Sequence, residues 1–287
     1  MQNQKKAYIY ALTAIFLWST VASAFKIALS VLSTEIILFY ASISASLVLF
    51  IFYYFDSDAP RIQIKDLQKS ITPSFFNPFI YYLVLFEAYD RLPAQIAQPL
   101  NYTWPIILSI FSAFVFHEKI KPIVWIGFLI SFIGVIIISS QNSSTYPLNT
   151  LGIILALSSS IIWSIYWIIN MKDTRKDSLK LFLNFSMGSL FILIYILIKG
   201  VPFEFSTTGL LASFYIGLFE MGITFFIWLK ALNLATQTSK INHLVFLSPF
   251  LSFIFIAFVL KENIEWTSII GLLVIILGII SQKIVKQ

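Results

Sequence analysis

The sequence contains no cysteine, which excludes disulfide bonds, thiolate metal sites and a cysteine nucleophile. It has only two histidines, His117 and His243, which argues against a zinc site. Charged residues make up 11% of the chain, well below the roughly 25% of an average soluble domain. The formal charge of +6 comes without any basic run interleaved with polar structure, so it does not indicate a nucleic-acid partner. We therefore expect no metal and no cofactor.

Sequence motifs of membrane-embedded enzymes are also missing. There is no HExxH, no GxSxG and no pair of aspartates within an apolar run, so metal, serine and aspartyl chemistry lack their residues. A GxxxxGK[ST] loop is absent too, so ATP is not expected to drive the protein directly. We interpret the chain as a non-enzyme, with a channel or a membrane scaffold as alternatives to a carrier.

Hydrophobic residues make up 59% of the chain, and the mean hydropathy is +0.88, so the main solvent of the folded protein is expected to be a lipid bilayer. Apolar runs recur near the ~20 residues needed to cross ~30 Å of hydrocarbon. These runs predict an all-α integral membrane protein with ten transmembrane helices and no soluble domain. The predicted helices cover residues 7–28, 35–55, 71–90, 93–116, 122–140, 149–171, 179–198, 208–231, 237–260 and 265–282.

Basic residues are distributed unevenly between the two sides that ten spans would create. Fifteen of the nineteen Lys and Arg fall on the side that holds both termini. Cytoplasmic loops are enriched in Lys and Arg, so this bias predicts a multi-pass protein of the cytoplasmic (inner) membrane with both termini in the cytoplasm.

An internal repeat divides the chain near its midpoint. A shift of 144 residues aligns Pro105 with Pro249 and Glu118 with Glu262, and it also aligns two glycine pairs, Gly127 with Gly271 and Gly134 with Gly278. The repeat predicts two five-helix domains, residues 1–142 and 143–287. Because five is odd, the second copy must have inverted topology, which is typical of secondary transporters with alternating access.

These matched positions resemble the drug/metabolite transporter superfamily, specifically its EamA-type ten-helix members. The segment 101–105, NYTWP, and the Trp-Ser pair at 163–164 are more narrowly similar to aromatic amino acid exporters of the YddG type. The resemblance implies that six aromatic residues line a central cavity between the two repeats, where stacking and cation-π attraction would hold the substrate. They are Trp18, Tyr81, Tyr82, Tyr102, Trp104 and Trp163.

The fourth predicted helix carries polar residues on one face. Gln98, Asn101, Pro105, Ser109 and Ser112 recur at spacings of three and four. Proline has no N–H and clashes with the carbonyl four residues earlier, so Pro105 should interrupt the helix, and Pro249 repeats the pattern in the ninth helix. A hydrated cavity would satisfy the freed groups, and packing between helices is the alternative. We predict Pro105 and Pro249 to be gating hinges.

A stripe in the sixth predicted helix contains Ser160, Trp163, Trp167 and Asn170. Tryptophan normally lies at the headgroup level, so a tryptophan at interior depth needs a partner for its indole N–H. We predict substrate contacts at Trp163 and Trp167. A core tryptophan bonded to a neighbouring serine is the alternative.

Ionisable residues within the bilayer are candidates for function. Glu220 lies near the middle of the eighth helix and His243 lies in the ninth, and both are candidates for coupling to protons. Glu220 could instead balance a substrate ammonium group. A structural carboxyl group at Glu220 is the alternative. For Glu118 and Glu262 we expect helix caps at the starts of the fifth and tenth helices. The paired glycines are expected to form helix contacts, within one protomer or between the protomers of a homodimer.

The sequence thus predicts a secondary transporter that exports small amphipathic metabolites. The predicted substrates are mainly amino acids, including aromatic ones. Few cations lie away from the helix ends, which argues against phosphate-bearing substrates that need Arg or Lys clamps. A permease for another metabolite or drug, such as a purine, a sugar or a phosphorylated compound, is the alternative.

Overall fold

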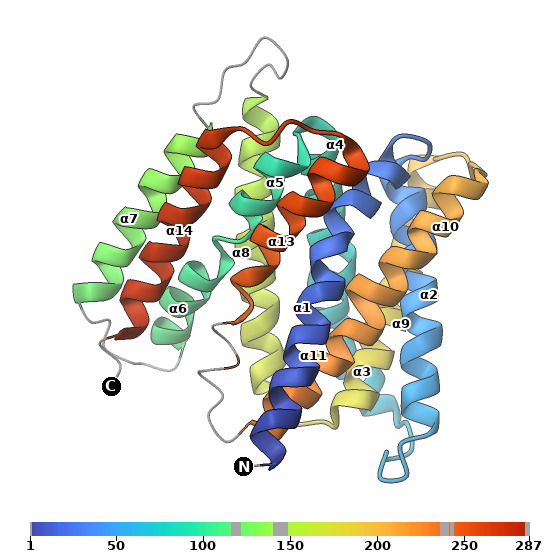
Figure 1. Ribbon diagram of the computed structural model, residues 1–287. Coiled ribbons are helices and arrows are strands. Elements are labelled where there is room, and N and C mark those ends of the chain that lie inside the picture. The colour runs from blue at the N-terminus through green and yellow to red at the C-terminus, as the bar shows by residue number, and fades with distance from the viewer. Residues whose placement is uncertain (1, 116–121, 140–148, 236–240, 242–243, 285–287) are drawn as a thin grey trace. The chain divides into compact units, whose positions relative to one another are not determined.

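A computed structural model describes residues 2–115, 122–139, 149–235, 241 and 244–284 (Figure 1). In these ranges the chain is built of helices, with no strand assigned. His243 and Glu118 lie outside the described residues, as do the side chains of Ser109 and Ser112. The contacts divide the chain into two compact units. Unit 1 comprises residues 1–83 and 173–255, and unit 2 comprises residues 84–172 and 256–287, so each unit takes helices from both halves of the sequence.

Unit 1 is organised around two long helices, α1 (Gln2–Leu29) and α2 (Thr34–Tyr54). Helix α1 packs against α10, α11 and α13, and α2 packs along α9 and the π-helical turn η2. Helix α3 and the turn η1 pack against α9. The bounds are α3 (Ile64–Ser74), η1 (Phe75–Ile80), α9 (Asp177–Lys199), α10 (Thr207–Ile216), η2 (Gly217–Gly222), α11 (Ile223–Leu234) and α13 (Leu247–Phe255).

The third predicted helix is broken in its middle. Asn77 in η1 has φ −145° and ψ 122°, an extended conformation, and Pro78 follows it. A Cβ atom at Gly188 of α9 would collide with the Pro78 ring, so only glycine lets the two backbones come this close. The helix resumes as α4 (Tyr81–Arg91), and the boundary between the units falls within α4.

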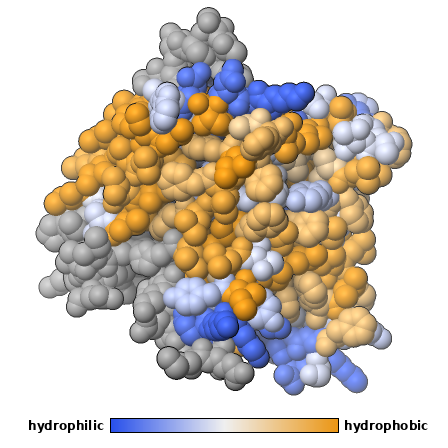
Figure 2. Space-filling view, viewed as in Figure 1, coloured by the Kyte–Doolittle hydropathy of each residue, from blue (hydrophilic) through white to orange (hydrophobic). Residues whose placement is uncertain are grey.

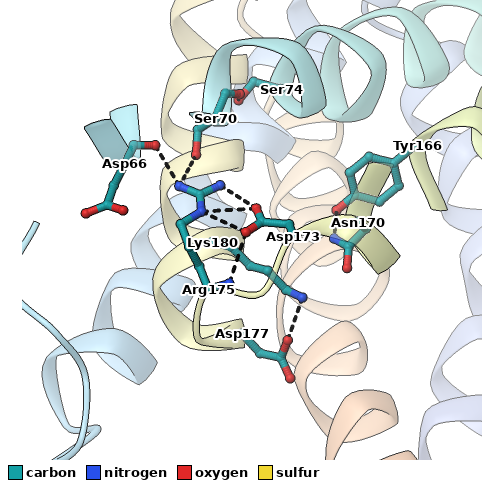
Figure 3. A network of polar contacts seen from close by, with 9 residues as sticks. All are labelled: Asp66, Ser70, Ser74, Tyr166, Asn170, Asp173, Arg175, Asp177 and Lys180. Atoms are coloured by element: carbon teal, nitrogen blue, oxygen red, sulfur yellow. Dashed lines mark hydrogen bonds and ion pairs between the residues drawn. The ribbon is translucent and has the colours of Figure 1, made fainter. Parts of the chain in front are cut away.

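An ion-pair network fixes α3 to the start of α9 (Figure 3). Arg175 donates to Asp173 through Nη2 at 2.6 Å, and its Nη1 donates to the Asp66 carbonyl at 2.6 Å and to Ser70 Oγ at 2.9 Å. Burial alone would raise the pKa of Asp173, but the hydrogen bonds from Arg175 outweigh it and hold that pKa below its ordinary value. The guanidinium group therefore links two helices through donors that water cannot easily replace.

Unit 2 contains the end of α4 and the remaining helices. Its elements are α5 (Ala94–Asn101), α6 (Trp104–Val115), α7 (Pro122–Ser139), α8 (Thr150–Lys172), η3 (Ile256–Leu260) and α14 (Trp266–Ile284). Helices α5 and α6 pack against α8, and α14 packs along α7.

The paired glycines lie in the contact between α7 and α14, as predicted. A Cβ atom at Gly134 would lie 2.6 Å from the Gly271 carbonyl oxygen, and one at Gly278 would lie 2.5 Å from the Gly127 carbonyl oxygen. Ser131 Oγ donates to the Ile275 carbonyl at 3.0 Å across the same contact. Small residues allow close backbone approach between membrane helices. These glycines are therefore used within the chain.

The prediction that Glu262 caps the tenth predicted helix is wrong. Its carboxylate accepts hydrogen bonds from the backbone N–H groups of Ala94 at 3.2 Å and Gln95 at 3.4 Å, at the start of α5. It was expected at the start of the tenth predicted helix, which is α14. The expectation considered only sequence neighbours, whereas the unit's packing brings the start of a distant helix within reach.

Within the described residues, five helical segments are long and apolar enough to cross a membrane. They are Gln4–Leu29, Thr34–Tyr54, Thr150–Lys172, Asp177–Lys199 and Thr207–Leu234. Shorter apolar helices include Trp125–Ile138 and Trp266–Ser281. Figure 2 shows that the exposed side of α7 and α14 is largely hydrophobic, and Leu129, Phe132 and Leu277 are more than half exposed there. Apolar surface of this extent suits contact with lipid.

Candidate functional site

The predicted site residues are distributed over both units. Unit 1 contains Trp18, Tyr81, Tyr82, Glu220 and Pro249. Unit 2 contains Gln98, Asn101, Tyr102, Trp104, Pro105, Trp163 and Trp167. Within each unit the structure brings several of these side chains together.

Glu220 is the centre of a cluster in unit 1. Tyr82 donates through its hydroxyl to Glu220 Oε1 at 3.2 Å, and the Trp18 indole Nε1 donates to the Glu220 backbone carbonyl at 3.4 Å. Residues from three separate elements, α1, α4 and η2, therefore meet at Glu220, Tyr82 at its carboxyl group and Trp18 at its backbone carbonyl. Sequence reasoning had placed all three among the candidates but had not paired them.

The backbone of η2 explains how Glu220 reaches this position. A π-helical turn inserts one extra residue into the hydrogen-bond ladder and occurs often at functional sites. Thr224 Oγ1 donates to the Phe219 carbonyl at 2.5 Å. This bond gives a carbonyl of the turn a hydrogen-bond donor. A Cβ atom at Gly217 would collide with Ser44 of α2, so this glycine lets η2 lie directly against α2.

The two aromatic residues that bond to Glu220 pack against further aromatic rings. The ring centroids of Trp18 and Trp228 are 5.4 Å apart, and Trp18 contacts Phe225 edge to face at 6.2 Å. Tyr81 lies against Tyr82 with centroids 4.7 Å apart. Aromatic faces attract cations, and a carboxylate completes the recognition of an ammonium group. This arrangement can bind an amphipathic amine.

The fourth predicted helix of the sequence is interrupted in unit 2. Helix α5 ends at Asn101, Tyr102 and Thr103 form a turn, and α6 begins at Trp104 with Pro105 in its first turn. Proline is tolerated in a first turn because its missing N–H would have no intrahelical partner there. In unit 1 the same pattern recurs, since Val245 and Phe246 form a turn before α13 and Pro249 lies in its first turn. The gating role of the two prolines stays a prediction.

Serines of α8 hold the interrupted helix. Asn101 Nδ2 donates to Ser159 Oγ at 2.8 Å, Thr103 Oγ1 contacts Ser160 Oγ at 3.1 Å, and Ser164 Oγ donates to the Trp104 carbonyl at 3.0 Å. These bonds fix the turn and the first residue of α6 to α8. Sequence analysis missed Ser159, Ser164 and Thr103, because single hydroxyl residues are common in apolar helices and carry no distinct signal.

The aromatic stripe of α8 is buried in unit 2. Trp163 is 8% exposed, and its ring centroid lies 5.6 Å from Tyr166 and 6.0 Å from Trp167. Asn170 Nδ2 donates to the Tyr166 hydroxyl at 3.2 Å. The Trp167 Nε1–H is buried and makes no hydrogen bond to the described residues.

Both halves of the chain match the same protein family. The EamA-like transporter family matches residues 5–140 and again residues 150–281. A solved crystal structure covers 96% of this chain and 98% of its own, with a TM-score of 0.68 and 20% sequence identity. That likeness supports the fold alone.

Relatives share modest identity with this chain. An uncharacterized transporter of Clostridium kluyveri is 27% identical over 176 residues, which cover 58% of this chain and 56% of the relative. An uncharacterized transporter of Archaeoglobus fulgidus is 22% identical and covers 96% of both chains. The aromatic amino acid exporter YddG of Ancylobacter novellus is 24% identical over 155 residues, 52% of this chain and 53% of that exporter.

Proposed function

Because the chain belongs to the EamA-like transporter family, we propose that it is a secondary transporter that exports small amphipathic metabolites, most of all amino acids including aromatic ones. Export of aromatic amino acids is the activity named for one relative, which this chain matches over about half of its length. We propose alternating access as the mechanism and Pro105 and Pro249 as its hinges.

The cluster around Glu220 carries this proposal. Glu220 accepts a hydrogen bond from Tyr82, and Trp18, which bonds to its backbone carbonyl, packs against Phe225 and Trp228, so the cluster offers an acceptor and aromatic rings. A substrate with an ammonium group and an apolar side chain suits both features. These residues include no Arg or Lys that could clamp a phosphate group, so the cluster favours amino acids over phosphorylated compounds.

We further propose that the chain crosses the membrane ten times as two inverted five-helix repeats, residues 1–142 and 143–287, with both termini in the cytoplasm. The two family matches and the charge bias support this topology. The natural absence of cysteine allows a direct test by single-cysteine labelling. Gln2→Cys and Lys65→Cys should react only with reagents supplied from the cytoplasmic side, and Phe203→Cys only from the outside. Labelling of positions 2 and 287 from opposite faces would exclude the ten-span topology.

Counterflow in proteoliposomes tests the transport activity. Vesicles loaded with unlabelled L-phenylalanine should accumulate labelled L-phenylalanine transiently, because a carrier exchanges its substrate across the membrane. A channel would equilibrate the label without this overshoot. A panel of amino acids, amines, purines and sugar phosphates would then define the substrate class, and counterflow with sugar phosphates but not with amino acids would overturn the proposal.

A further inference from the structure

Two buried amides of unit 1 have no hydrogen-bond partner among the described residues. Asn77 is 0% exposed and Asn184 is 1% exposed, and neither the Nδ2 nor the Oδ1 atom of either residue makes a hydrogen bond. Leaving one buried polar group unpaired costs about 1–3 kcal/mol. Folded proteins contain few such groups, so two complete amides in one unit require a physical reason.

Both amides lie at the same contact, between η1 and α9. Gly188 of α9 lies directly against the Pro78 ring, and Asn77 precedes Pro78 in the chain. Asn184 is one helical turn before Gly188 and therefore projects from the same side of α9. The two side chains thus flank one place in the unit.

The broken helix at this contact is an independent indication of a binding site. Pro78 has no N–H, so the Ser74 carbonyl loses its usual α-helical donor, and Asn77 is extended. Irregular backbone at membrane depth is tolerated where protein or a cavity satisfies it. In secondary transporters, discontinuous helices form the sites that bind substrates and ions.

Aromatic contacts join helix α9, which carries Asn184, to the elements around Glu220. Phe185 of α9 contacts Phe225 edge to face at 6.2 Å, and Phe225 contacts Trp18 at 6.2 Å. The amides therefore lie in the same unit as the aromatic residues Trp18, Tyr81 and Tyr82 that the sequence predicts to contact substrate.

From this arrangement we infer that Asn77 and Asn184 bind the α-carboxylate of an amino acid substrate. The inference rests on the proposed function. Nδ2 groups donate charge-assisted hydrogen bonds to a carboxylate, and such bonds are stronger than neutral ones. Unlike Arg or Lys, the neutral amides leave no unpaired charge in the unit when no substrate is bound. Their lack of partners within the unit is then the condition that keeps the donors free for the substrate.

Substitution of each amide by leucine tests the inference in the full-length protein. Binding of L-phenylalanine and of phenethylamine, which lacks the carboxylate, is measured by the change in tryptophan fluorescence. The wild-type protein should prefer L-phenylalanine by at least about tenfold, because a site built to hydrogen-bond a group rejects an analogue without it. Asn184→Leu and Asn77→Leu should each weaken L-phenylalanine binding about tenfold or more and change phenethylamine binding less than about twofold.

Thermal stability separates a binding role from a structural one. Asn184→Leu removes unpaired polar atoms, so its unfolding temperature should equal or exceed that of the wild type. Asn170→Leu is the control, because Asn170 is also buried, at 8% exposed, but donates to Tyr166. This control should lower the unfolding temperature and leave the preference for L-phenylalanine unchanged.

Each alternative outcome is decisive. If the wild-type protein prefers L-phenylalanine and the leucine variants keep that preference, the inference is wrong and the proposed function stands. If Asn184→Leu destabilises the protein as much as Asn170→Leu does, the amide is structural and the inference is again wrong. If the wild-type protein binds neither compound, the proposed function fails and the inference fails with it.

Discussion

Gln95 and Glu262 link the start of α5 to the segment that precedes α14. Glu262 accepts hydrogen bonds from the first N–H groups of α5, while Gln95 of α5 accepts one from the Glu265 N–H at 2.8 Å, directly before α14. Gln95 Oε1 also accepts from Ser268 Oγ at 3.1 Å, and its Nε2 donates to the Asn263 carbonyl at 2.8 Å. The exchange satisfies helix-terminal groups that the bilayer could not satisfy.

Gln95→Ala should therefore destabilise unit 2 more than a single cap deletion. Loss of a cap costs about 1 kcal/mol, and removal of a fully buried side chain leaves several polar groups unpaired as well. We expect a lower unfolding temperature in detergent, measured by tryptophan fluorescence. Glu262→Gln keeps an acceptor and should have a smaller effect. If Gln95→Ala and the wild type unfold at the same temperature, these bonds make no net contribution to the free energy of unfolding.

Glu220→Gln should reduce the transport of amine-bearing substrates by roughly 10–100-fold, because a hydrogen bond to a charged group contributes about 1.5–3 kcal/mol. The measurement is uptake into proteoliposomes with and without a pH gradient. If Glu220 couples transport to protons, the variant should also lose its response to the gradient. Glu204→Gln provides a control, since Glu204 lies outside the helices and accepts from the Ser33 N–H. Unaltered transport and pH dependence in Glu220→Gln would leave Glu220 with a structural role.

Trp163→Ala should lower the transport of aromatic amino acids about tenfold relative to small aliphatic ones, since an aromatic pair contributes about 0.5–1.5 kcal/mol. The ratio of the two rates is informative because partial unfolding would reduce both equally. Trp125→Ala is the control, because Trp125 of α7 is 49% exposed. Unchanged transport across a broad amino acid panel would remove Trp163 from the site.

Gly134→Ala should destabilise the contact between α7 and α14 by about 1–3 kcal/mol, because a new methyl group would lie 2.6 Å from the Gly271 carbonyl oxygen. Alanine normally stabilises a helix relative to glycine by about 1 kcal/mol, so a decrease in unfolding temperature identifies the close contact. Ile133→Ala is the adjacent control, since Ile133 is 53% exposed. A more stable Gly134→Ala variant would contradict the packing described.

Asp173 makes stability depend on acid pH. Its folded-state pKa is lowered, so the ion pair with Arg175 contributes fully above the ordinary value near 4 and is lost as the pH falls through the folded pKa. The unfolding temperature should therefore decrease steeply below about pH 4. Asp173→Asn should already cost roughly 3 kcal/mol at pH 7, because Arg175 stays buried without its charge partner, and should flatten this decrease.

Asp58→Asn is the control for the acid profile, since the Asp58 side chain is 85% exposed and lies 3.5 Å from Lys176. It should leave both the stability at pH 7 and the acid profile nearly unchanged. An acid profile of Asp173→Asn that matches the wild type would assign the pH dependence to other groups.

Features that depend on local chemistry were predictable from the sequence. Proline marked the places where α6 and α13 begin, and glycines at a spacing of seven marked packing faces on α7 and α14. Features that depend on which helices meet were not predictable. Glu262 was assigned to the wrong helix, and Asn184 was not singled out, since one amide in an apolar run has no signature until its surroundings are known.

The glycine contact of α7 and α14 also has a consequence for biosynthesis. The two helices lie more than a hundred residues apart in the chain, so the ribosome releases α7 long before α14. During translation the glycine face of α7 must therefore stay uncovered until α14 has been made. Chains truncated before Trp266 should keep this face uncovered and become substrates for membrane proteases, whereas chains that contain α14 should be protected.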